Sequence, residues 1–169
     1  MNCYSQGNGS GSINFFGARS GVAGLTDTFY DFKQDRTRRP TPMEPNVGYN
    51  ALLTQFVRGG FNEAVFSTYY KSDKPLYSSQ IFIPRVPAEE GPRAFGLQDV
   101  VQPRMWAALY KGRVIAPEAG TFRFAGYGDD VLVVRFDGRI VLDAGINNYT
   151  SMPPGAKYNY EYMASVGTS

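Results

Sequence analysis

One long stretch in the second half of the chain constrains the fold most, because apolar strand-like runs alternate there with turn residues. Met105 to Ile115 reads MWAALYKGRVI, Thr121 to Tyr127 reads TFRFAGY, and Val131 to Phe136 reads VLVVRF. The pair Asp137-Gly138 then separates VLVVRF from RIVL, and Asp-Gly between apolar runs is a strong signal for a tight hairpin. The pattern predicts an antiparallel meander, and hence a mainly β fold, a sandwich or a barrel.

Composition agrees with this expectation. The 169 residues suit one domain with a sizeable core. Aromatic residues make up 15% of the chain and fit pleated, half-buried surfaces. The 19 Gly and 11 Pro supply the many turns that an all-β domain needs.

Strand and loop patterns also occur outside this stretch. Leu25 to Phe32 (LTDTFYDF) predicts the first strand, Ser79 to Pro84 (SQIFIP) a short one, and the region of Tyr158 to Met163 one more. Between Pro84 and Gly96 we expect an extended crossing. Its adjacent carboxylates, Glu89-Glu90, would point to opposite faces there and are expected to be exposed loop residues.

A single helix is predicted in the first half of the chain. Its apolar stripe recurs with helical spacing at Tyr49, Leu52, Leu53, Phe56 and Val57. We expect an N-cap at Asn46 and a stop at Gly59-Gly60. The following residues 61–70 could extend the helix or begin a strand, and periodicity leaves both open.

Composition divides the chain into an arm and a body. Residues 1–21 are rich in Gly, Ser and Asn and resemble a linker, in which Phe15 and Phe16 could dock on a neighbouring surface. Residues 22–169 are expected to form the β domain. This gives an oligomer, assembled through the arm and an open sheet edge, as one expected form of the protein.

Charge and residue usage exclude several functions. The net charge of +2 does not favour nucleic acid. The basic cluster in the loop region, Lys33, Arg36, Arg38 and Arg39, is either solvated or an anion contact. The chain lacks His, has one Cys, and carries neither a G-x-S-x-G nor a phosphate-loop motif, so we expect no enzyme activity.

The chain also lacks the patterns of membrane or leader segments. Its apolar runs are all shorter than the roughly 18 residues that a membrane-spanning helix needs. The first residues, MNCYSQGNGSGSINFFG, have neither a basic nor an apolar region of the signal-peptide kind. We therefore expect no membrane span and no signal peptide in these residues.

From Trp106 to Gly145 the sequence resembles the PA14 family, the domain family of the anthrax protective antigen. The residues that carry the resemblance are Gly112, Ala116-Pro117-Glu118, Gly120 to Phe124, Asp129-Asp130, Val131 to Phe136 and Asp137 to Asp143. The strand around Thr28-Phe29-Tyr30 corresponds to the family's opening strand. Residues 40–101 would then be an insertion that contains the helix, and C-terminal strands would be missing.

This resemblance implies a PA14-type antiparallel β-sandwich or barrel on an extracellular or cell-envelope protein. Such domains occur in bacterial toxins, adhesins, yeast flocculins and glycosidases, where they bind carbohydrate or protein. The expected partner is thus a glycan or a cell-surface protein. The alternative is a structural or assembly subunit, or a protein-interaction domain, completed by a neighbouring chain.

In lectin members of the family, an adjacent Asp pair binds calcium, and the resemblance carries that role to Asp129 and Asp130. Calcium takes six to eight oxygen ligands, which Asn147 and Asn148 could help to supply. The aromatic rings that could stack on a sugar are those of Tyr127 and Tyr149. Alternatively, the Asp pair caps a hairpin turn by accepting backbone N–H groups.

Overall fold

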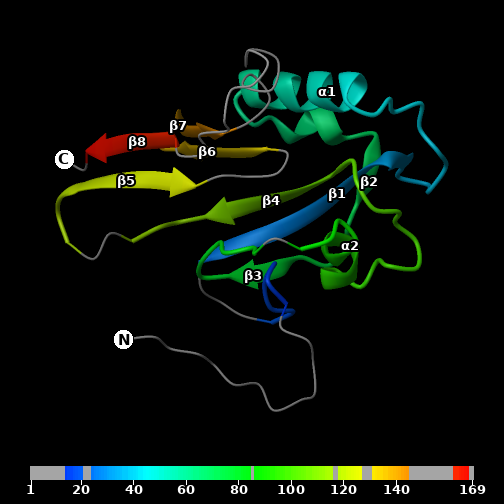
Figure 1. Ribbon diagram of the computed structural model, residues 1–169, viewed down its shortest axis with the longest axis horizontal. Coiled ribbons are helices and arrows are strands. Elements are labelled where there is room, and N and C mark those ends of the chain that lie inside the picture. The colour runs from blue at the N-terminus through cyan, green and yellow to red at the C-terminus, as the bar shows by residue number, and fades with distance from the viewer. Residues whose placement is uncertain are drawn as a thin grey trace, which may run out of the picture. The chain divides into compact units, whose positions relative to one another are not determined.

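The computed structural model describes residues 14–20, 24–84, 86–115, 118–126, 131–144 and 162–167 (Figure 1). In these residues antiparallel strands predominate over helices, which confirms a mainly β fold. The described strands form three sheets, none of which closes on itself. Whether they belong to a sandwich or a barrel stays a prediction.

The chain divides into two compact units. Unit 1 takes the described residues of Met1–Asp31 and Lys71–Arg113, and unit 2 those of Phe32–Tyr70 and Val114–Ser169. Strand β1 (Leu25–Asp35) belongs to both, because the division falls within it. The first predicted strand is thus confirmed, and it continues three residues past Phe32.

The four-stranded sheet is organised around β1, and its strands β3 (Leu76–Ser78) and β4 (Trp106–Gly112) lie in unit 1. Both pair with β1 in antiparallel fashion, and β2 (Tyr69–Lys71) is a further neighbour. Both faces of β1 are buried, with Phe29 on one and Tyr30 on the other. A central strand covered on both sides explains the dense aromatic sequence of this segment.

Helix α2 (Glu90–Ala94) replaces the extended crossing expected between Pro84 and Gly96, so that expectation is wrong in its middle. Pro92 is compatible with the helix because it lies in the first turn, where a backbone N–H has no helical partner. Glu89 is exposed, and Glu90 forms an ion pair with Arg93 one turn later.

The predicted strand at Ser79 to Pro84 is also wrong. The strand lies earlier, at Leu76–Ser78, and residues 79–84 fall outside every described strand. The Ser78 hydroxyl accepts a hydrogen bond from the Gln80 N–H at 3.2 Å. Such a local side-chain turn competes with ladder pairing and ends the strand.

In unit 2, helix α1 (Val47–Arg58) confirms the predicted helix, and Leu52, Leu53 and Phe56 form its buried stripe. Asn46 does precede the helix, but its role as a side-chain cap is wrong. Its backbone is left-handed, with φ of 65°, and its side chain makes no capping hydrogen bond within the described chain. Gly59 follows as the C-cap, with its N–H bonded to the Gln55 carbonyl at 2.9 Å.

The stretch 61–70 does not extend α1, which ends at Arg58, but a strand does begin within it. A 3-10 helix, η1 (Glu63–Phe66), comes first and is capped by Asn62, whose side chain accepts from the Ala64 N–H at 3.0 Å. Strand β2 then begins at Tyr69. Helical and strand spacing of the apolar residues could not be told apart in this stretch, because a single helical turn is too short to show a period.

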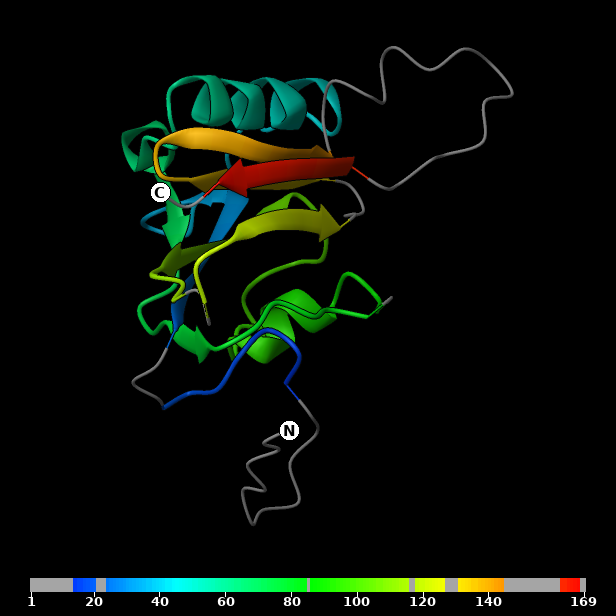
Figure 2. The ribbon, with the colours of Figure 1, turned by 90° about the vertical axis from the view of Figure 1, so that its left-hand side faces the viewer.

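The remaining strands of unit 2 form two pairs rather than a meander. Strand β5 (Thr121–Gly126) pairs with β8 (Tyr162–Gly167), and β6 (Leu132–Phe136) with β7 (Arg139–Ala144). Figure 2 shows α1 running beside the β6–β7 hairpin. The predicted meander is wrong in its connections, because β4 pairs with β1 and β5 with β8.

The β6–β7 hairpin itself is confirmed at Asp137-Gly138. Both residues have positive φ, 45° and 75°. This is the backbone that a two-residue hairpin turn requires, and Asp and Gly tolerate it better than most residues. The last strand lies at Tyr162–Gly167, later than the predicted 158–163.

None of the helices in the described residues combines the length and apolar character needed to cross a membrane.

Candidate functional site

The calcium and sugar residues expected from the sequence lie outside the described residues. They are Tyr127, Asp129, Asp130, Asn147, Asn148 and Tyr149. By sequence, the Asp pair falls in the connection between β5, which ends at Gly126, and β6, which begins at Leu132. Among the described residues, no three acidic or Cys side chains are grouped as metal ligands.

The most unusual polar group of the described structure is Asp27 in unit 1. It lies on β1, opposite Leu76 of β3 and opposite Tyr110 of β4. Its side chain is completely buried, and neither carboxyl oxygen has a hydrogen-bond partner of normal geometry among the described residues. Burial raises the pKa of Asp27 to about 7, although the neighbouring Tyr110 hydroxyl partly offsets this.

Tyr110 connects this carboxyl to a segment far away in the sequence. Its hydroxyl donates a hydrogen bond to the Phe16 carbonyl oxygen at 3.1 Å. Burial, reinforced by the charge of Asp27, raises the pKa of Tyr110 well above its usual value. The hydroxyl therefore keeps its proton throughout the physiological pH range.

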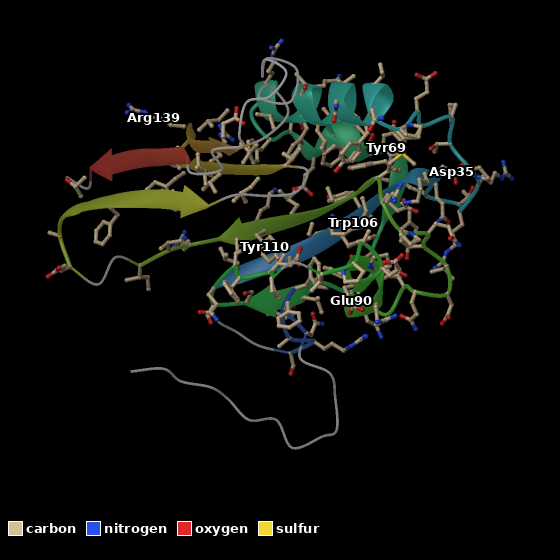
Figure 3. All side chains as sticks on the ribbon, in the orientation of Figure 1. Asp35, Tyr69, Glu90, Trp106, Tyr110 and Arg139 are labelled. Atoms are coloured by element: carbon tan, nitrogen blue, oxygen red, sulfur yellow. The ribbon has the colours of Figure 1, made fainter. Side chains whose placement is uncertain are left out.

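Next to Asp27 and Tyr110 lies a cluster of four aromatic side chains, which we call the aromatic cluster: Phe16, Phe29, Phe95 and Trp106. The ring centroid of Phe29 lies 5.1 Å from that of Phe95 and 5.4 Å from that of Trp106. Phe16 contacts the same two rings edge-on, at 6.4 Å and 5.8 Å. Figure 3 shows Trp106, a member of the cluster, and Tyr110 along strand β4.

A second buried carboxylate, Asp31, lies on the same face of β1, opposite Trp106. Four residues of extended chain separate it from Asp27 by about 13 Å. Carboxyl pairs that cleave glycosidic bonds lie roughly 5 to 9.5 Å apart. The two buried acids of β1 therefore do not have the spacing of a glycosidase pair.

Sequence reasoning overlooked Asp27 and Asp31. A signal was present, because LTDTFYDF places two acids four residues apart on one face of an otherwise aromatic and apolar strand. Charged residues are almost never fully buried unless they are paired, so a buried position was not expected.

The basic loop contains an acidic residue that organises it. The Asp35 carboxylate accepts from the Arg39 N–H at 3.0 Å and from Thr37 at 2.7 and 2.8 Å. These bonds, first that of Arg39, lower the pKa of Asp35. Arg38 stacks over the Tyr70 ring, 5.1 Å from its centroid. This loop is therefore shaped by its own contacts, and both alternatives for its basic residues stay predictions.

An apolar run is exposed after β3. Ile81, Phe82 and Ile83 are 47%, 70% and 37% exposed, in a segment outside the described strands. Three consecutive exposed apolar residues are unusual on a surface that contacts only water.

Comparison with protein-family models, with curated proteins and with solved structures finds no match to this chain.

Proposed function

We propose that the chain is a non-catalytic binding module of the PA14 type, acting outside the cytoplasm on a carbohydrate or another cell-surface ligand. The observation that carries the proposal is the β6–β7 hairpin with its Asp137-Gly138 turn. The resemblance places an apolar strand, this turn and a return strand at these positions, after a strand at Thr121–Gly126. Strands and turn thus agree with the sequence pattern at fixed offsets.

In this proposal calcium binds at Asp129 and Asp130. Two carboxylates supply part of the six to eight oxygens that the ion takes, and Asn147 and Asn148 add neutral oxygens. Remaining positions on the ion would accept sugar hydroxyls, with Tyr127 or Tyr149 stacking on the ring. The carboxylates of β1 do not compete for this role, because Asp27 is completely buried.

A calorimetric calcium titration tests the metal site. The wild-type chain is expected to bind calcium with sub-millimolar affinity, and the double variant Asp129→Asn/Asp130→Asn to lose the signal. A matched control, Asp73→Asn/Asp99→Asn, removes the same charge from two exposed acids and should bind as wild type does. A screen of glycans with and without chelator then tests the ligand class.

Two results would count against this function. If wild type gives no binding heat, the Asp pair is a turn cap and the calcium-lectin proposal fails. If calcium binds but glycan binding is absent with and without chelator, the carbohydrate part fails and a protein ligand takes its place.

The exposed run Ile81-Phe82-Ile83 favours a second candidate, an assembly module whose partner is a second copy of the chain. Its flanks, Ser79-Gln80 and Pro84, are uncharged, so two copies can align antiparallel without opposing like charges. Size-exclusion chromatography with light scattering should then show a dimer that Phe82→Gln converts to monomer. Val114→Gln, at another exposed apolar residue, should leave the dimer intact. A wild-type monomer at high concentration would remove this candidate.

A further inference from the structure

The segment Asn14–Ser20, which we call the N-terminal strap, closes unit 1 on the side of β3. Ala18 exchanges two backbone hydrogen bonds with Tyr77 of β3, at 2.8 and 2.9 Å. The Asn14 amide donates to the Ala94 carbonyl at 3.0 Å. Between these anchors Phe16 is 2% exposed, within the aromatic cluster.

The strap approaches β3 more closely than a side chain would allow. At Gly17, φ is 143°, and an added Cβ would lie 2.8 Å from the Tyr77 carbonyl oxygen. Glycine therefore permits this docking, and a larger residue would weaken it. The strap is held by a small number of specific contacts, so the loss of one can change its attachment.

A further contact of the strap, the hydrogen bond from the Tyr110 hydroxyl to the Phe16 carbonyl oxygen, depends on the single proton of that hydroxyl. When Asp27 is protonated, its O–H can donate to the Tyr110 oxygen, and Tyr110 can donate to the Phe16 carbonyl. When Asp27 is ionised, its carboxylate competes for the Tyr110 proton, and a charge-assisted bond is the stronger one. The Phe16 carbonyl then loses its donor, and the buried carboxylate gains by exposure to water.

We propose that Asp27 and Tyr110 form a proton-dependent fastening for the N-terminal strap, closed while Asp27 is protonated and loosened when Asp27 ionises. Loosening releases one proton to solvent, withdraws Phe16 from the aromatic cluster and frees the β3 edge at Tyr77. The inference concerns a control of unit 1 and is separate from the calcium and glycan site.

Of the described groups around Asp27, Tyr110 is the one that can share a proton with its carboxyl. At the same position β3 presents Leu76, and the strap presents Phe16. Other charged groups nearby have contacts of their own. Arg19 of the strap lies beside Gly96, and Glu90 and Arg93 of α2 form an ion pair with each other. Asp31 lies about 13 Å from Asp27 along β1. Within the described residues, Tyr110 is the titratable group that acts on the Asp27 carboxyl.

The direction of the pH effect follows from the two states. Burial raises the pKa of Asp27 to about 7 in the closed state, whereas in an opened, hydrated state the pKa approaches its ordinary value of 3.8. Opening is therefore coupled to proton release, and its equilibrium constant rises by up to about tenfold per pH unit between about pH 4 and about pH 7. Above that window both states are ionised, and the opening constant is level.

Trp106 reports this opening directly, because it is the single tryptophan of the chain and Phe16 packs against it. Acrylamide quenching of its fluorescence is measured in the full chain between about pH 4 and about pH 8. We expect quenching to rise with pH and then level off, while circular dichroism shows the strands intact. Quenching that is constant with pH would overturn the proposal.

Three variants sharpen this test. Asp27→Asn should remove the pH dependence, and retention of the wild-type profile would overturn the proposal. Gly17→Ala loosens the strap without touching the proton-sharing pair, so it gives high quenching at every pH. Asp73→Asn, an exposed acid of the same unit, should reproduce the wild-type curve.

A second measurement covers the case in which Asp27→Asn fails to fold. In wild type, the amide of Ala18 bonds to the Tyr77 carbonyl, and its hydrogen-exchange protection factor reports strap opening alone. The proposal expects this factor to fall between about pH 4 and about pH 7 while β1–β4 amides stay protected. Equal changes in both sets would mean unfolding of unit 1 as a whole and would overturn the proposal.

Discussion

Asp27 and Tyr110 occupy directly opposed positions on the antiparallel strands β1 and β4, and the carboxyl of the first is completely buried. A side chain that in water would be ionised at neutral pH is thus placed where water does not reach it. Ionisation of this carboxyl is costly in the folded chain, so its protonation and the stability of unit 1 depend on each other.

The free energy of unfolding should therefore fall as pH rises from about 4 to about 7. In this window unfolded chains have lost the Asp27 proton while folded chains keep it, because the pKa rises from 3.8 to about 7 on folding. The shift corresponds to at most about 4 kcal/mol, since each pKa unit is about 1.4 kcal/mol. Asp27→Asn should lose this component of the pH dependence in urea titrations. A variant curve parallel to that of wild type would contradict the assignment.

Gly91 of α2 should tolerate no side chain. A Cβ at this position would lie 2.5 Å from Cζ2 of Trp106, whose indole N–H is bonded to the Ala88 carbonyl. Gly91→Ala should therefore displace the Trp106 ring and lower the free energy of unfolding by about 1 to 3 kcal/mol, measured by thermal or urea unfolding. Gly120→Ala is the control, because its Cβ would meet nothing closer than 4.0 Å. Equal stability of the two variants would contradict this packing.

The hairpin turn should be sensitive at Gly138. Its φ of 75° is strained for a residue with a Cβ, so Gly138→Ala should destabilise unit 2 by about 1 kcal/mol. Asp137→Asn should change stability little, because Asn also tolerates a left-handed backbone. Differential scanning calorimetry of both variants checks this, and a neutral Gly138→Ala would show that the turn has another backbone.

Arg135 of β6 should stabilise the end of helix α1. Its guanidinium donates to the Gly60 carbonyl at 2.5 Å and lies 6.0 Å from the Phe61 ring centroid. Arg135→Met keeps an apolar side chain but removes the hydrogen-bond donor, and we expect the free energy of unfolding to fall by about 0.5 to 1.5 kcal/mol. Arg139→Met, an exposed position on β7, provides the control. Identical unfolding midpoints for both variants would contradict the contact.

The sequence predicted elements better than their partners. Helix α1 and the Asp137-Gly138 turn depend on spacing and on backbone preference, which neighbouring residues determine. The pairing of β4 with β1 and of β5 with β8 depends on residues far away in the chain, and periodicity contains no information on them. The local sequence also failed to predict the backbone of Asn46, which has a positive φ and does not cap the helix with its side chain.

The candidate sites show a similar limit. The Asp129-Asp130 prediction came from a resemblance and lies outside the described residues, so it stays a prediction. Asp27 was missed because its burial arises only in the folded sheet, where β1 pairs with both β3 and β4. The chemistry of such a residue is a property of the assembled sheet and is invisible in the local sequence.

The division inside β1 also affects how the protein is made. A ribosome synthesises β1 early, but β4, which pairs with it, is complete only at Gly112. Unit 2 needs β8 as well, which ends at Gly167. Unit 1 can therefore close during translation while β8 of unit 2 is still unmade. Until Gly112 emerges, the aromatic residues of β1 lack their main strand partner and are most exposed to misassembly or chaperone binding.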